Sequence, residues 1–209
     1  MKYDVIIVGA GPGGIYSAYE LMKKCSDKKI AVFDSGYSLK KRHCPIDGEK
    51  VKACIKCKSC SIMSGFGGAG AFSDGKYNIT NDFGGTLYEY IGKKAATELM
   101  QYVDDINMAH GGEGTKMYST AGTNLKKVCL QNRLKLLNAS VRHLGTDINL
   151  VVLGQLYDEL KEHVDFYFES PVSHIECLEN GGYRVWSNDK SYDCEKCIVS
   201  VGRSGSKWM

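Results

Sequence analysis

The chain has 209 residues and a formal charge of +3, which is too mild to indicate nucleic acid or an anionic membrane as a partner. With 43% hydrophobic and 24% charged residues, the composition predicts a packed core and excludes wholesale disorder. No run approaches the roughly 18 apolar residues of a membrane span, and the N-terminus lacks the apolar region of a secretory signal. We therefore expect a cytoplasmic protein whose nine cysteines are metal ligands, redox thiols or core residues rather than disulfides.

The first 34 residues predict a strand over residues 3–8, a glycine turn, a helix over residues 12–24 and a second strand over residues 30–33. The turn reads Gly9, Ala10, Gly11, Pro12, Gly13, Gly14, which is a G-x-G-x-x-G fingerprint. Gly9 permits the tight turn, Gly11 lets the backbone approach a pyrophosphate, and Gly14 lets the helix pack close to the strand. This arrangement predicts a dinucleotide site, against the alternative of a glycine-rich turn without a ligand.

Asp34 directly follows the second predicted strand, where the acidic residue of a dinucleotide site is expected. Its carboxylate can accept hydrogen bonds from the adenosine ribose hydroxyls and disfavours a 2′-phosphate. The phosphates would lie at the N-terminus of the predicted helix, where unpaired N–H groups carry a partial positive charge. These features are shared by NAD and FAD sites, so the fingerprint alone does not separate the two cofactors.

Residues 35–80 look irregular, and three helices are expected after them, over residues 86–109, over residues 124–137, and from a cap at Thr146 or Asp147 to about residue 160. Alternating side chains then predict short strands over residues 164–169, 172–178, 183–187, 191–195 and 197–201. This β-meander, with a final strand running into Gly202, resembles the FAD-binding domain of glutathione-reductase-like flavoproteins. We expect an α/β, Rossmann-like FAD-binding domain that is incomplete within residues 1–209 and is interrupted by an insertion over residues 41–147. The resemblance implies that Gly202 lies at the cofactor.

A second glycine loop runs from Ser64 to Lys76 and reads SGFGGAGAFSDGK. So many glycines make a poor helix and a poor strand, but such a loop can surround a flat or anionic ligand with backbone N–H groups. Ser73 and Lys76 add a hydroxyl donor and a positive charge. A flexible linker is the alternative, although Phe66 and Phe72 are unlike a Gly/Ser spacer.

Four stretches carry a resemblance to a known family: VIIVGAGPGGIYSAYEL at 5–21, CIKCKSCSIMSGFGGAGAFSDGKYN at 54–78, VRHLGTD at 141–147 and VSVGRSGSKW at 199–208. On these motifs the chain resembles the N-terminal part of the uncharacterised bacterial FAD-dependent dehydrogenases, which are NAD(P)/FAD-dependent oxidoreductases. The resemblance implies that the second glycine loop runs beside the flavin. It thereby makes cofactor or active-site candidates of Gly67, Gly68, Gly70, Ser73 and Lys76. It also implies a longer parent protein, with a later strand whose acid binds the ribityl chain of the flavin.

Three cysteines, Cys54, Cys57 and Cys60, form a C-x2-C-x2-C pattern, and Cys44 is the natural fourth ligand. Such spacing lets thiolates converge on one metal or cluster corner. An iron–sulfur cluster, a structural zinc ion, a redox dithiol and inert thiols all stay open as interpretations. Cys194 and Cys197 form another C-x-x-C but on strand-like sequence, where positions three apart face opposite sides, so we expect them to be structural.

Arg142 and His143 are weaker catalytic candidates, together with Lys76. His143 could donate a proton, and Arg142 could hold an anionic substrate or, alternatively, be paired at a strand end. The four other histidines show no partner pattern and are expected on the surface.

The sequence thus predicts an FAD-dependent oxidoreductase that passes hydride or electrons between FAD and a small molecule or redox protein, with NAD(P)H as one candidate reductant. The alternatives are an NAD(H)-binding dehydrogenase without flavin, a non-catalytic fragment, and a zinc-binding module for nucleic acid. The dinucleotide fingerprint argues against the last, so no nucleic-acid partner is expected.

Overall fold

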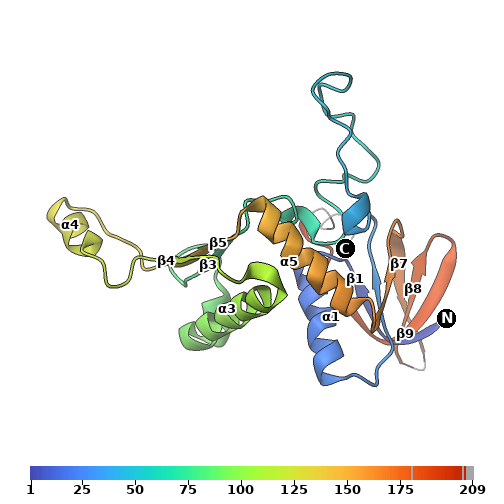
Figure 1. Cartoon of the computed structure of the whole chain (residues 1–209). Coiled ribbons are helices and arrows are strands. Elements are labelled where there is room, and N and C mark those ends of the chain that lie inside the picture. The colour runs from blue at the N-terminus through green and yellow to red at the C-terminus, as the bar shows by residue number, and fades with distance from the viewer. Residues whose placement is uncertain (180, 204, 206–209) are drawn as a thin grey trace. The chain divides into compact units, whose positions relative to one another are not determined.

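The computed structural model describes residues 1–179, 181–203 and 205. The chain divides into two compact units: residues 1–71 with 156–209 form the first, and residues 72–155 form the second. The cysteine segment and the first glycines of the second loop belong to the first unit, and the insertion expected over residues 41–147 stays a prediction. Figure 1 shows the course of the chain.

The first unit is built on one six-stranded sheet with the order β6-β2-β1-β9-β8-β7. The strands β1 (Lys2–Val8), β2 (Ile30–Phe33), β6 (Val164–Tyr167) and β9 (Lys190–Val199) pair in parallel, with Val5 opposite Ile30 in β1 and β2. The strands β7 (Val172–Cys177) and β8 (Tyr183–Ser187) add antiparallel pairs next to β9 and complete the expected meander.

Helix α1 (Pro12–Lys24) connects β1 to β2, as the sequence predicts. Its buried side chains Ile15, Ala18, Tyr19 and Met22 recur at helical spacing and form one apolar face. All four residues of β2 are buried, which is the continuous apolar pattern of a central parallel strand. This β1–α1–β2 unit fixes the turn that carries the glycine fingerprint.

The second unit contains a small antiparallel sheet with the order β3-β5-β4, made of β3 (Lys76–Ile79), β5 (Ser140–His143) and β4 (Met117–Ser119). Its helical segments are α2 (Leu87–Ile91), α3 (Lys93–Asn107) with a further turn over Met108–Gly112, and α4 (Leu125–Gln131). Helix α5 (Gly145–Leu160) continues from the second unit into the first. Two short 3-10 turns, Leu39–Lys41 and Gly68–Gly70, belong to the first unit. Among the described residues, no helix is both long and apolar enough to cross a bilayer.

Several sequence expectations were wrong in detail. The helix expected over residues 86–109 breaks at Gly92, whose φ of +81° interrupts the helical backbone between α2 and α3. The helix expected over residues 124–137 ends at Gln131, and Arg133 has a φ of +60° just beyond it. The strands expected over residues 191–195 and 197–201 are one strand, β9. His110, expected on the surface, is buried, and its Nδ1 lies 2.6 Å from the Ile106 carbonyl oxygen.

The expectation that Cys194 and Cys197 face opposite sides of their strand was also wrong. Both side chains pack into the same apolar cluster, and the two thiols share a hydrogen bond that, with burial, raises the pKa of Cys197.

Candidate functional site

The glycine fingerprint forms a tight turn between β1 and α1. The Gly9 backbone has a φ of +105° and its N–H donates to the Phe33 carbonyl at 2.7 Å, which ties the turn to the end of β2. A Cβ on Gly14 would collide with the Gly9 carbonyl oxygen, so a larger residue would force the helix away from the turn. These positions therefore have the structural roles that the fingerprint predicts for the first and third glycines.

The N-terminus of α1 has an unblocked first turn. Gly11 is the N-cap, no side chain caps the helix, and the first turn carries no acidic residue. A Cβ on Gly11 would meet the Gly68 Cα at 3.9 Å, which is ordinary contact distance, and Pro12 and Gly13 are exposed. The helix end thus presents backbone N–H groups and a partial positive charge, the features that bind a phosphate.

Asp34 lies at the end of β2 beside this turn. Its Oδ2 accepts a hydrogen bond from the Ala10 N–H at 2.7 Å, and its Oδ1 accepts one from the Gly36 N–H at 2.7 Å. The side chain is half-buried. Since each carboxylate oxygen has more than one acceptor site, these two bonds position the group and leave acceptor capacity for ribose hydroxyls.

The end of β9 also reaches the fingerprint turn. The Ser200 N–H donates to the Val8 carbonyl at 2.8 Å, and its own carbonyl oxygen occupies the space that a Cβ on Gly9 would need. The Ser200 hydroxyl lies where a Cβ on Gly13 would point. Gly202 follows with a φ of +64° and is exposed. Part of the VSVGRSGSKW motif, residues 204 and 206–208, lies outside the described residues.

The second glycine loop packs against the fingerprint turn through its first half. The Gly67 N–H donates to the Ala10 carbonyl at 2.8 Å, and a Cβ on Gly68 would lie 3.0 Å from the Gly11 Cα. Gly65 and Gly67 have positive φ values of +106° and +88°, which favour glycine. Gly70 has open space around it. The structure thus brings Gly67 and Gly68 to the predicted dinucleotide site.

The second half of that loop belongs to the second unit. Lys76 and His143 are direct neighbours across the β3–β5 pair, and the Lys76 Nζ lies 2.6 Å from Asp74 Oδ2. The hydrogen bond from Lys76, supported by the nearby His143, lowers the pKa of Asp74. The Ser73 hydroxyl accepts from the Gly75 N–H at 3.3 Å. The catalytic or cofactor roles of Ser73, Lys76 and His143 stay predictions.

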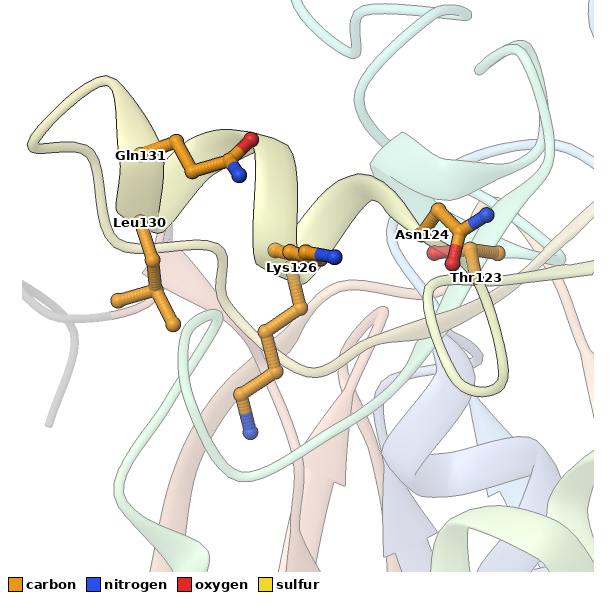
Figure 2. Close-up of a pocket in the computed structure, with 6 residues that line it drawn as sticks. Thr123, Asn124, Lys126, Leu130 and Gln131 are labelled. Carbon is orange, nitrogen blue, oxygen red and sulfur yellow. The ribbon is translucent and has the colours of Figure 1, made fainter.

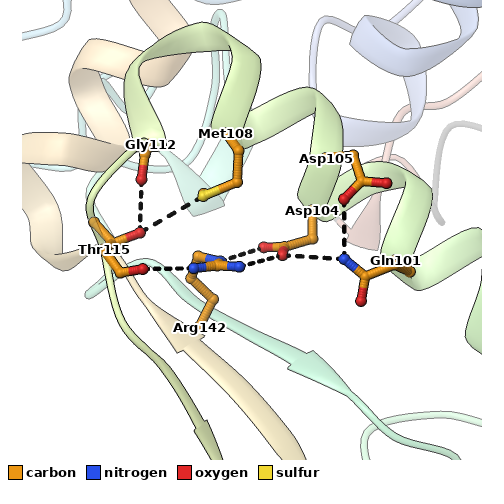
Figure 3. A network of polar contacts seen from close by, with 7 residues as sticks. All are labelled: Gln101, Asp104, Asp105, Met108, Gly112, Thr115 and Arg142. Atoms are coloured by element: carbon orange, nitrogen blue, oxygen red, sulfur yellow. Dashed lines mark hydrogen bonds and ion pairs between the residues drawn. The ribbon is translucent and has the colours of Figure 1, made fainter.

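Arg142 lies in a buried ion pair (Figure 3). Its Nε and Nη2 donate to the two carboxylate oxygens of Asp104 at 2.7 Å each, and its Nη1 donates to the Thr115 carbonyl at 2.6 Å. The Asp104 side chain is 1% exposed and the Arg142 side chain 12%. This is the pairing at a strand that the sequence offered as the alternative to substrate binding. We therefore leave Arg142 out of the proposed binding residues.

The cysteine segment does not form a metal site. Within the part of the chain that is described, no three His, Cys, Asp or Glu side chains come together in a way that could hold a metal ion. Cys54 and Cys57 are exposed, whereas Cys44 and Cys60 are half-buried. The residues as folded do not fit an iron–sulfur cluster or a zinc ion, so no chemical step is derived from either.

A surface hollow of about 640 Å³ lies against helix α4 (Figure 2). It is lined by Thr123, Asn124, Lys126, Lys127, Leu130 and Gln131. The hollow is wide open, and none of the residues predicted to bind a cofactor or to act in catalysis lines it. We therefore take the fingerprint turn, with its oriented backbone groups and carboxylate, as the candidate site.

Sequence reasoning missed two residues that shape this site. Ser200 lies within the VSVGRSGSKW stretch but is not among the predicted site residues, and its contact with Gly13 comes from the parallel pairing of β9 with β1. Arg42 is buried and holds the second glycine loop through backbone carbonyls. Arg42 lies in the basic stretch KKRHC, which looks like a solvent-exposed run of charges, and no local sequence pattern predicts that its side chain is buried.

Comparisons with known proteins support the fold. No family model matches the chain. An uncharacterised protein of Clostridium beijerinckii is 24% identical over 206 residues, which are 98% of this chain and 32% of that protein. Glycine oxidase from Geobacillus kaustophilus matches with a TM-score of 0.54 and 15% identity, over 99% of this chain and 57% of the oxidase. L-amino acid deaminase from Proteus vulgaris matches with a TM-score of 0.48 and 11% identity, over 96% of this chain and 47% of the deaminase.

The likeness to glycine oxidase and the observed sheet confirm the predicted fold class, an α/β fold with a parallel sheet of the Rossmann type. The chain spans about a third of the curated relative that it matches and little more than half of the oxidase. At these identities the comparisons show the fold, and the activity is a matter for proposal.

Proposed function

We propose that the chain is the FAD-binding portion of a flavin-dependent oxidoreductase. The observation that carries this proposal is the joining of three elements at one turn: the unblocked N-terminus of α1, the Asp34 carboxylate and the Gly65–Gly68 segment. The backbone N–H groups of the helix end suit the pyrophosphate, and Asp34 suits the adenosine ribose. The family resemblance and the meander favour FAD over NAD.

The residues of this chain would bind and orient the cofactor. Gly11 and Gly13 would let the pyrophosphate approach the helix end, while Asp34 would accept hydrogen bonds from the ribose hydroxyls. Gly67, Gly68 and Gly70 would approach the flavin part, as the resemblance implies, and Gly202 would lie at the cofactor. Bound FAD would supply the redox chemistry, accepting or donating a hydride or single electrons.

The reaction partner would be a small molecule or a redox protein, with NAD(P)H as one candidate reductant. We include neither an iron–sulfur cluster nor zinc in this proposal, because the cysteine segment does not bring enough ligands together. Iron, sulfide and zinc analysis of an anaerobic preparation tests that part directly.

Equilibrium titration of the purified chain with FAD, FMN and NAD⁺ tests the proposal. If the fingerprint binds the ADP part of FAD, FAD should bind, and the flavin fluorescence should be quenched on binding. FMN, which lacks the ADP part, should bind much more weakly. Tight NAD⁺ binding without FAD binding would favour the dehydrogenase alternative. Equal binding of FMN and FAD would contradict the proposed use of the fingerprint.

A further inference from the structure

Arg42 is a buried guanidinium that donates all of its described hydrogen bonds to one segment of backbone. Its Nε donates to the Ser61 carbonyl at 2.8 Å, its Nη2 to the Ile62 carbonyl at 2.8 Å, and its Nη1 to the Phe66 carbonyl at 2.6 Å. The residue is 5% exposed. A planar fork with several donors can bind several carbonyls of one segment at once, which a lysine ammonium cannot do with the same geometry.

The segment that Arg42 holds is the one that lies on the dinucleotide turn. Phe66, whose carbonyl accepts from Arg42, donates its own N–H to the Tyr37 carbonyl at 3.1 Å, and the next residue, Gly67, donates to the Ala10 carbonyl. The Phe66 ring is fully buried among Tyr157, Phe166 and Phe168. Arg42 therefore fixes the backbone next to Gly67 and Gly68, which contact Ala10 and Gly11 of the fingerprint turn.

Arg42 also stands at the base of the cysteine segment. The segment of residues 43–60 starts directly after Arg42 and ends at Ser61 and Ile62, whose carbonyls accept hydrogen bonds from Arg42. Figure 1 draws this segment without helix or strand. Burial lowers the pKa of Arg42, and the charge of the Asp34 carboxylate opposes this change.

We propose that Arg42 is a positioning residue for the cofactor site: it holds the Ser61–Gly67 backbone against the fingerprint turn. The proposal rests on the proposed FAD function for its ligand, but the seating itself is a property of the protein without cofactor. Arg42 has no assigned contact with the reacting atoms, so its effect would be on cofactor affinity and loop order.

The test compares Arg42→Met and Arg42→Lys with Arg184→Met, a matched control that removes an exposed guanidinium paired with Asp193 in the same unit. Hydrogen exchange of the cofactor-free protein reports the Phe66 and Gly67 amides, and FAD titration reports affinity. In Arg42→Met we expect faster hydrogen exchange at these amides, because charged hydrogen bonds to the loop are lost. We also expect the affinity for FAD to fall by roughly tenfold or more. Arg42→Lys should lie between, and Arg184→Met should match the wild type in both.

The two readouts separate failure of this proposal from failure of the proposed function. If the wild type binds no FAD, the function fails, while the exchange of Phe66 and Gly67 still decides the role of Arg42. Wild-type exchange and wild-type FAD affinity in folded Arg42→Met would overturn the proposal. If Arg42→Met does not fold, the decision passes to Arg42→Lys. Wild-type exchange and wild-type FAD affinity in Arg42→Lys would overturn the proposal, because the planar guanidinium would then be dispensable.

Discussion

Removing one partner of the Arg142–Asp104 pair should strongly destabilise the second unit. Asp104→Ala leaves a guanidinium that is 12% exposed with the Thr115 carbonyl as its remaining described acceptor, and Arg142→Met leaves a carboxylate that is 1% exposed. Two charge-assisted bonds of 2.7 Å are lost in either case. Stranding one charge of a buried pair typically costs about 3–5 kcal/mol. The double variant Asp104→Leu/Arg142→Met should recover most of this loss, because no buried charge is then unpaired.

Native-state hydrogen exchange of the α3 amides measures the stability of this unit without requiring the whole chain to unfold in one step. The expected result is a large loss in each single variant and a coupling free energy of about 2 kcal/mol or more between the two sites. A loss below about 1 kcal/mol in both single variants would refute the assigned ion pair and return Arg142 to the candidates for substrate binding.

Three further predictions follow from the first unit. Asp34→Asn should weaken ADP binding by about 1–3 kcal/mol and abolish the preference for ADP over 2′-deoxy-ADP. Glu179→Gln serves as the control. An unchanged preference in Asp34→Asn would remove Asp34 from the ribose site. Gly14→Ala should abolish folding or FAD binding because its Cβ would collide with the Gly9 carbonyl oxygen. Gly154→Ala, whose Cβ meets no atom within 4 Å, should leave both nearly intact, and equal effects of the two substitutions would argue against this packing. Burial and the hydrogen bonds with Tyr167 and Asp165 raise the pKa of Tyr3 above its ordinary value of 10.0, so the folded state keeps a proton that the unfolded state releases. Alkaline unfolding titrations should show the free energy of unfolding falling above about pH 10, less steeply in Tyr3→Phe, and identical slopes would contradict this assignment.

The β1–α1–β2 unit was predictable because each part has a local cause. The apolar run of β1, the glycines of the turn and the helical spacing from Ile15 to Met22 all point to the same structure. The position of Asp34 beside the turn also follows from local order, since the acid directly follows β2. The meander was predictable for the same reason, through alternating side chains and a glycine turn.

The second unit was harder to predict because its helix patterns are not matched by burial. Leu125 and Val128 are three residues apart, which is helical spacing, but both are exposed, and α4 ends sooner than the pattern suggests. At Gly92 the backbone conformation, rather than side-chain periodicity, decides where one helix ends and another begins. The spacing of apolar residues does not predict a backbone conformation of this kind.

The contacts that complete the site were beyond sequence reasoning because they join distant residues. Arg42 reaches Ser61, Ile62 and Phe66, and Ser200 reaches the turn through strand pairing with β1. The C-x-x-C at Cys194 and Cys197 shows the opposite error. A regular strand separates such positions, yet the two thiols share a hydrogen bond, and nothing in the local sequence predicts it.

The most direct test of the central claim is the identity of the chromophore that the purified chain releases on denaturation, after reconstitution with FAD where the preparation is colourless. We predict a flavin absorption spectrum, and a rise in fluorescence when phosphodiesterase separates the flavin from AMP, which identifies FAD. Absence of flavin after reconstitution, from a protein that is folded by circular dichroism, would contradict the account.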